Sequence, residues 1–323
     1  MSLSYGLSFD GSETPENAMA QARIADDAGA TTAWVASHLF QREPIATSAM
    51  MLANTRSLGI ALMAMSPYSM HPVYATMAAA TLEEYFPGRV TLCFGVGAPR
   101  DLEAAGITAE NPLGTVREAV AIARALLAGE QINFEGKRYH VAGRRLAGGT
   151  RNVPIFIAAS GPQMLEMAGA IADGVLISAA TSPQFISASL DLVHKGEQAS
   201  GRTIRKSALV YVSADADRKA ARDRLRRTLG FILRGQHHAR NLALAGTQLD
   251  QAALARAYAA EDWETVNALI TDDVLANHSA SGTPDDVRAA LAAYRQIGVD
   301  EIVTSGLTDP QHLSTALNVL ANG

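Results

Sequence analysis

Small polar residues follow the apolar runs of this 323-residue chain, and one of them is an imidazole, that of His38. An imidazole can take up and release a proton near neutral pH. A lone histidine is more often structural, so a catalytic role for His38 depends on its place at the end of a predicted strand. The other residues that follow apolar runs are Asp10, Gly11, Ser37, Ser66, Pro67, Tyr68, Gly95, Gly97, Ser160, Gly161 and Ser178.

The stretch "AASGPQ", residues 158–163, places small residues between an apolar run and a helical pattern. Pro162 suits the first turn of a helix, where an amide hydrogen would have no partner. The remaining amides and the positive end of the helix dipole could bind a phosphate. An ordinary serine cap with a glycine for tight packing explains the same residues, and the motif alone favours that simpler explanation.

The stretch "FGVG", residues 94–97, supplies two glycines at which the backbone could approach a flat ring closely. It lacks the third glycine and the downstream acid of a dinucleotide-binding fingerprint. A plain turn at a strand end is the alternative explanation for Gly95 and Gly97.

Other chemistries have little support. His237 and His238 have no cysteine or carboxylate at ligand spacing, so we expect no metal site. The sole cysteine, Cys93, lies inside an apolar run, and no nucleophile-elbow motif is present. Arginines recur every four residues at 218, 222 and 226 among aspartates, which predicts a salt-bridged surface; binding of an anionic ligand is the less favoured alternative.

The elements that must position these residues alternate between apolar runs and helical patterns, apart from one polar, hairpin-like segment at 137–146. This alternation predicts a parallel sheet with crossover helices. Eight strands favour a closed α/β TIM barrel, and an open doubly wound sheet is the alternative. The predicted strands span 3–9, 32–37, 57–65, 89–97, 154–160, 174–178, 207–213 and 299–306.

A long interval, residues 214–298, separates the last two predicted strands. It is too long for one crossover, and its patterns predict helices at 215–234, 250–259, 262–270 and 283–297. We therefore expect a helical insertion beside the barrel mouth, acting as a lid or an oligomer surface. The whole chain, residues 1–323, is interpreted as one domain.

Composition limits the partners and the location. The formal charge of −5 and the absence of a long basic run argue against nucleic acid as a partner. No apolar run is long enough to cross a membrane, and the first residues do not resemble a secretion signal. With a single cysteine as well, we expect a cytoplasmic protein that acts on a small molecule.

Several stretches together resemble the bacterial luciferase-like superfamily, and within it the reductases that use the deazaflavin coenzyme F420, of the methylenetetrahydromethanopterin reductase type. The resemblance covers essentially the whole chain and implies a (β/α)8 barrel with F420 or FMN at its mouth, in a homodimer. The stretches are "AWVASH", "MSPYSMHP", "TLEEYFPGRVTLCFGVG", "IAASGPQMLEMAGAIADGVLI" and "SGTPDDVRAALAAYRQIGVDEIV".

The resemblance also implies roles for individual residues. His38 would donate a proton or steady charge during hydride transfer. A non-prolyl cis peptide bond would lie at or near Met63-Ala64 and form a bulge behind the cofactor ring. The expected cofactor-binding residues are Ser37, Met63, Ala64, Ser66, Gly95, Gly97, Ala159, Ser160, Gly161, Pro162, Gln163 and Ser178.

Two positions depart from the reductase pattern. Ser37 stands where the family has an Asp associated with deazaflavin sites, and Ser8 stands where the pterin reductases have a Glu. The sequence therefore predicts first an F420-dependent oxidoreductase. The alternatives are an FMN-dependent monooxygenase of the same fold and a flavin-binding protein without turnover.

Overall fold

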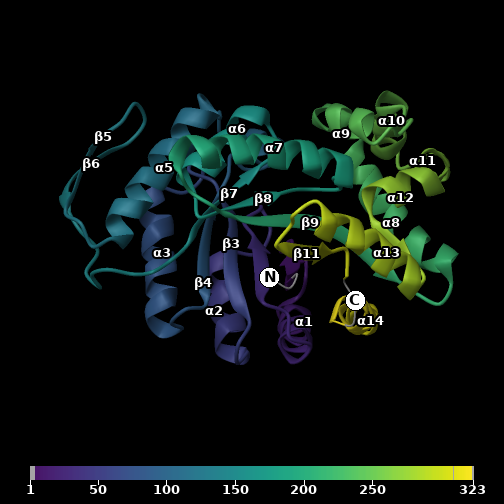
Figure 1. Cartoon of the computed structure of the whole chain (residues 1–323), viewed down its shortest axis with the longest axis horizontal. Coiled ribbons are helices and arrows are strands. Elements are labelled where there is room, and N and C mark those ends of the chain that lie inside the picture. The colour runs from purple at the N-terminus through teal and green to yellow at the C-terminus, as the bar shows by residue number, and fades with distance from the viewer. Residues whose placement is uncertain (1–3, 308, 322–323) are drawn as a thin grey trace.

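A closed parallel barrel forms the centre of the molecule in the computed structural model, which describes residues 4–307 and 309–321 (Figure 1). Strand β1 pairs with both β2 and β11, and β8 pairs with β9, so the sheet has no open edge between its eight barrel strands. The TIM-barrel prediction is confirmed, and the doubly wound alternative is wrong. The barrel strands are β1 Ser4–Phe9, β2 Thr32–Ala36, β3 Gly59–Met65, β4 Val90–Phe94, β7 Ile155–Ala159, β8 Gly174–Ile177, β9 Arg205–Ala214 and β11 Glu301–Ser305.

Side chains alternate between the barrel interior and the surrounding helices, because successive residues of a strand point to opposite faces. Trp34, Cys93, Phe156 and Leu209 pack together inside the barrel. The neighbouring residues of the same strands, such as Val35, pack outward in the larger core against the helices. The interior is thus a filled core, and chemistry has room only at its ends.

The helices around the barrel begin in a regular way, since each of α1 to α7 starts with a proline. Proline is favoured there because its φ angle is already helical and its missing N–H would be unpaired. The helices outside the insertion are α1 Pro15–Asp27, α2 Pro44–Asn54, α3 Pro72–Tyr85, α4 Pro99–Ala104, α5 Pro112–Leu127, α6 Pro162–Ile171, α7 Pro183–Ser200 and α14 Pro310–Ala321.

The predicted polar hairpin consists of the antiparallel pair β5 Ile132–Glu135 and β6 His140–Arg144. The Glu118 carboxylate of α5 accepts hydrogen bonds from the backbone amides of Lys137, Arg138 and Tyr139 in the turn. Figure 1 shows this hairpin on the opposite side of the molecule from the insertion.

The insertion between β9 and β11 has its own apolar core, built around Leu225, Leu254 and Leu275. The four expected helices are present, and two short helices, α9 and α12, and a short strand, β10, were not predicted. β10 pairs in parallel with the end of β9. The elements are α8 Arg218–Leu233, a 3-10 turn at Gln236–His238, α9 Ala239–Leu244, α10 Gln251–Ala259, α11 Trp263–Leu269, α12 Asp272–His278, β10 Ala280–Gly282 and α13 Pro284–Gln296.

In the part of the chain that the structure describes, none of the helices combines the length and the apolar character needed to cross a bilayer.

Candidate functional site

All the barrel strands are parallel, so the residues that follow them meet at one rim. His38 follows β2 and Ser160 follows β7 at this rim. Residues that lie far apart in the sequence are therefore brought to one mouth, and this mouth is the candidate site.

A carboxylate from another element faces His38. Asp101 of α4 places its Oδ2 atom 3.4 Å from Nδ1 of His38, and the two side chains are 30% and 46% exposed. A carboxylate at Nδ1 orients the imidazole ring and leaves Nε2 as the nitrogen that can meet a substrate. His38 and Asp101 thus form a histidine–carboxylate pair.

Strand β3 bulges at the predicted place, between Leu62 and Met65. Met63 and Ala64 stand opposite a single residue of β4, Cys93, which follows from the pairs Leu62–Leu92 and Met65–Phe94. The amide of Ser37 donates to the carbonyl of Met63 at 2.6 Å, so the bulge is tied to the end of β2. Met63 is buried and Ser37 is half-buried.

The predicted cis peptide bond at Met63-Ala64 is wrong. The non-prolyl cis bond in the described residues joins Ser178 to Ala179, after β8. At β3 the extra residue of the bulge displaces the backbone without a cis bond, because two residues occupy the space opposite one.

Ser66 and the two glycines after β4 fit closely together. The Ser66 hydroxyl donates to the carbonyl of Val96 at 2.6 Å. Gly97 has a φ of +96°, and a Cβ atom there would lie 3.1 Å from Oγ of Ser66. A Cβ atom on Gly95 would lie 2.7 Å from Cβ of Ala64. Close packing therefore explains why both positions are glycine, and their contact with a cofactor stays a prediction.

The N-terminus of α6 is open. Ala159 is buried at the end of β7, whereas Ser160, Gly161, Pro162 and Gln163 are exposed. The N-cap residue is Gly161, and no side chain caps the helix. A Cβ atom on Gly161 would meet nothing within 4 Å, so this glycine is not required for packing. The simpler explanation, a serine cap with a tightly packed glycine, is therefore wrong.

The segment after β8 is held by the insertion. The carbonyl of Ala180, two residues after Ser178, accepts a hydrogen bond from Nδ2 of Asn241 at 2.8 Å and lies 3.1 Å from Nδ1 of His278. Burial lowers the pKa of His278 to about 4, so its ring is neutral near pH 7. The hydroxyl of Thr247 lies 2.9 Å from Nε2 of the same ring. The backbone two residues after Ser178 is thus held by residues more than sixty positions away in the chain.

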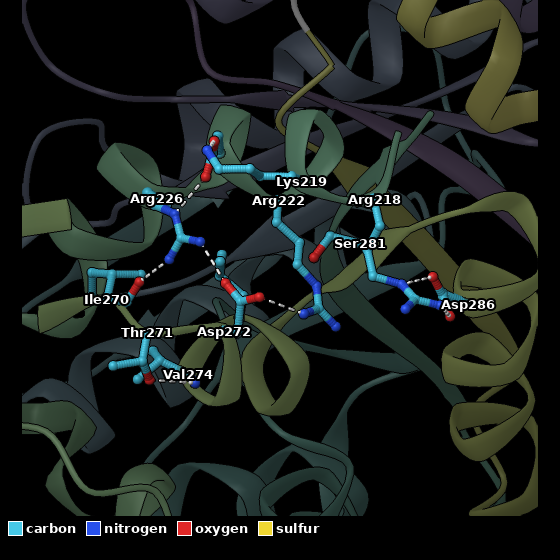
Figure 2. Close-up of polar contacts among 12 residues, drawn as sticks. Arg218, Lys219, Arg222, Arg226, Ile270, Thr271, Asp272, Val274, Ser281 and Asp286 are labelled. Atoms are coloured by element: carbon cyan, nitrogen blue, oxygen red, sulfur yellow. Dashed lines mark hydrogen bonds and ion pairs between the residues drawn. The ribbon is translucent and has the colours of Figure 1, made fainter. Parts of the chain in front are cut away.

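The regularly spaced arginines of α8 form ion pairs inside the insertion (Figure 2). Arg218 makes a two-point contact with Asp286 of α13, at 2.7 and 2.9 Å. Asp272, at the start of α12, contacts both Arg222, at 2.8 Å, and Arg226. The prediction of a salt-bridged surface is confirmed, and these arginines are engaged with aspartates and not with the mouth.

The family model for luciferase-like monooxygenases matches residues 3–301. The chain belongs to this family. The resemblance inferred from the sequence motifs is confirmed.

Two luciferase-like relatives match most of the chain, and both are named 5,10-methylenetetrahydromethanopterin reductase. The protein from Methanolobus tindarius is 29% identical over 315 residues, 95% of each chain. The protein from Archaeoglobus fulgidus is 30% identical over 297 residues, 89% of each chain.

Solved structures share the fold. A coenzyme F420-dependent tetrahydromethanopterin reductase from Methanopyrus kandleri has a TM-score of 0.91 at 22% identity and matches 99% of this chain and 98% of its own. The oxygenating constituent of 3,6-diketocamphane monooxygenase from Pseudomonas putida, in complex with FMN, has a TM-score of 0.73 at 18% identity, with 99% and 97% coverage.

In this luciferase-like chain, sequence reasoning missed Asp101, Asn241 and His278. Asp101 lies on a short helix beyond the β4 turn, and only residues directly after the strands were considered. A search of whole strand-end loops for carboxylates would have found it. Asn241 and His278 left no local signal, because their role depends on contacts across the fold.

Proposed function

We propose that this chain is an oxidoreductase that transfers a hydride between coenzyme F420 and a small organic substrate. The observation that carries the proposal is the open N-terminus of α6, where exposed Gly161 faces free space on the rim that also holds His38 and Asp101. Relatives named as F420-dependent or methylenetetrahydromethanopterin reductases support the choice of cofactor.

The residues at the mouth fit such a cofactor. Uncapped amides at the start of α6, from Ser160 to Gln163, would hold its phosphate with the help of the helix dipole. The β3 bulge at Met63 and Ala64, with Ser37, Ser66, Gly95, Gly97 and Ser178, would border its ring. A bound deazaflavin would supply two-electron hydride transfer without ready reaction with dioxygen.

His38 would control the proton that accompanies the hydride. With Nδ1 directed at Asp101, Nε2 is the nitrogen that would donate or accept a proton at the mouth. Asp101 keeps the ring in this orientation and stabilises it when it is protonated.

The test is a fluorescence titration with F420. Gly161→Asp places a capping carboxylate where we expect the phosphate, so it should weaken F420 binding about tenfold or more and leave the fold intact. Gly161→Ala adds a methyl group without charge into free space and should lose much less. Equal affinity in all three proteins would contradict the proposed phosphate site.

An FMN-dependent monooxygenase is the second candidate, favoured by Ser37 in place of the family's Asp. Unchanged F420 fluorescence together with tight binding of FMN would select it. Binding of F420 without turnover on a broad substrate panel, including the substrates of the named relatives, would select a non-catalytic flavin-binding protein.

We also propose that residues 1–323 form one domain that works in the cytoplasm as a homodimer. A single cysteine buried in the barrel interior and the acidic composition support this location.

A further inference from the structure

Two arginines approach the same aromatic ring, and one of them belongs to α4, the helix that carries Asp101. Arg100 precedes Asp101 in α4, and Arg234 directly follows α8 of the insertion. Both guanidinium groups lie near the ring of Phe231: its centroid is 6.0 Å from the Cζ atom of Arg100 and 3.9 Å from that of Arg234. The α4 segment and the insertion therefore meet at this ring.

The positive charge of this pair is not neutralised. Within residues 4–307 and 309–321, neither Arg100 nor Arg234 has a carboxylate at ion-pair distance, unlike Arg218, Arg222 and Arg226. Burial, and then the charge of Arg100, lowers the pKa of Arg234. Two guanidinium groups that repel each other are a favourable place for an anion.

Aromatic rings hold Arg234 in place. Arg234 lies over Phe231 and, at 4.7 Å, over Tyr258, and its Nη1 atom donates to the carbonyl of Phe231. Stacking occupies the faces of the guanidinium group and this bond engages Nη1, so the edge formed by the other nitrogens can bind two oxygens of a carboxylate or phosphate. The side chain of Arg234 is therefore arranged before any ligand arrives.

The location indicates which molecule would carry the anion. Arg100 is adjacent to Asp101, whose carboxylate lies 3.4 Å from His38. The cofactor phosphate is assigned to the α6 N-terminus, at the end of β7. The arginine pair therefore belongs to the side of the mouth where His38 would meet the substrate.

We propose that Arg100 and Arg234 bind a carboxylate or phosphate group of the substrate and select for anionic substrates. That the bound anion belongs to a substrate rests on the proposed function; the anion site itself does not.

The experiment measures binding of two probes, inorganic phosphate and glutarate, by calorimetry at constant ionic strength. The Gly161→Asp protein is the parent, so that the α6 terminus does not bind the phosphate. Arg100→Met and Arg234→Met remove one charge each and keep an apolar stem. Arg234→Lys keeps the charge. The matched control is Arg227→Met, which removes an arginine within α8 that stacks instead on Trp263, at 4.7 Å.

We expect at least one probe to bind the parent. Its affinity should fall about tenfold or more in Arg100→Met, and likewise in Arg234→Met, because each variant loses charged hydrogen bonds to the anion. Arg234→Lys should lose less, and Arg227→Met should match the parent. Probe binding that is absent in the parent, or equal in all variants, would overturn the proposal.

A second titration, of F420 into the same arginine variants with Gly161 intact, separates substrate from cofactor. F420 affinity should stay within about twofold of wild type. A loss as large as that for the probes would assign the pair to the anionic tail of the cofactor and overturn the proposal. If F420 fails to bind wild type while the probes bind as expected, the proposed function fails and the anion site stands.

Discussion

At the scale of single residues, the mouth depends on the contact between His38 and Asp101. One comes from the end of β2 and the other from α4, and a distance of 3.4 Å joins Nδ1 to Oδ2. Neither residue alone defines which ring nitrogen faces the mouth. This contact makes the proposed proton transfer testable by two variants with different expected effects.

We expect His38→Gln to lower the single-turnover rate of hydride transfer by roughly 10²–10⁴-fold, because the proton donor is removed. Asp101→Asn should cost less, roughly 10–100-fold, since the ring remains and only its orientation and charge partner are lost. Stopped-flow absorbance of F420 with an identified substrate measures both.

The matched control is His194→Gln. His194 also faces a carboxylate, that of Glu197 at 3.6 Å, but it lies near the C-terminal end of α7. A rate for His38→Gln equal to that of wild type would refute the role of His38.

His38 could be selected from the sequence because strand ends in a parallel barrel share one rim. Asp101 could not be paired with it, since the distance between them is set by the short helix α4. The same limit applies to Ser160: its hydroxyl was compatible with a cap, and only the backbone shows that Gly161 occupies the N-cap position.

At the scale of elements, the alternation of strands and helices was predictable because local signals agree. Proline at the start of each of α1 to α7 and apolar runs of strand length point to the same boundaries. The short elements α9, α12 and β10 were missed, because their stability comes from tertiary contacts and not from local pattern. α9 packs on α7, α12 packs on α8, and β10 pairs with β9. The site of the cis bond was transferred from relatives and failed for this chain.

The insertion should lose stability in mild acid because of His278. Burial holds the pKa of His278 at about 4, against 6.5 for an exposed histidine, so between these pH values the unfolded chain binds more protons. The free energy of unfolding should therefore be unaffected above pH 6.5 and fall by roughly 3 kcal/mol as the pH drops to 4. His238, whose pKa burial also lowers to about 4, adds a fall of the same sign.

Urea unfolding at a series of pH values measures this effect. His278→Gln should reduce the fall between pH 6.5 and pH 4, whatever its stability at pH 7. His140→Gln alters an exposed histidine of the hairpin and should leave the fall intact. If the fall is as large in His278→Gln as in wild type, the buried ring is not its source.

At the scale of the whole molecule, apolar side chains are exposed on neighbouring barrel helices. Tyr74 and Met77 of α3 are 59% and 46% exposed, and Met50 of α2 is 55% exposed. Tyr74 and Met77 lie three residues apart and so share one face of α3. Such a face fits contact with a second copy of the chain.

We expect sedimentation to give a dimer for wild type and a monomer for the double variant Tyr74→Asp, Met77→Asp, because burying two carboxylates at an interface is unfavourable. Leu244→Asp, at a 40% exposed position on α9, is the control and should remain dimeric. Dissociation by Leu244→Asp alone would instead assign the interface to the insertion.

The short strand β10 limits how the insertion can move. Residues 280–282 pair with Val212, Ser213 and Ala214 of β9, so the barrel wall continues into the insertion itself. With Ala180 fastened as well, a hinge would have to break sheet pairing before the helices could swing open. We therefore expect small molecules to enter and leave the mouth through side-chain movements, while the backbone of the barrel and the insertion stays in place. If this insertion is grafted onto another barrel, β10 should be included with it. Without β10, the last residues of β9, Val212 to Ala214, would lose their pairing partner.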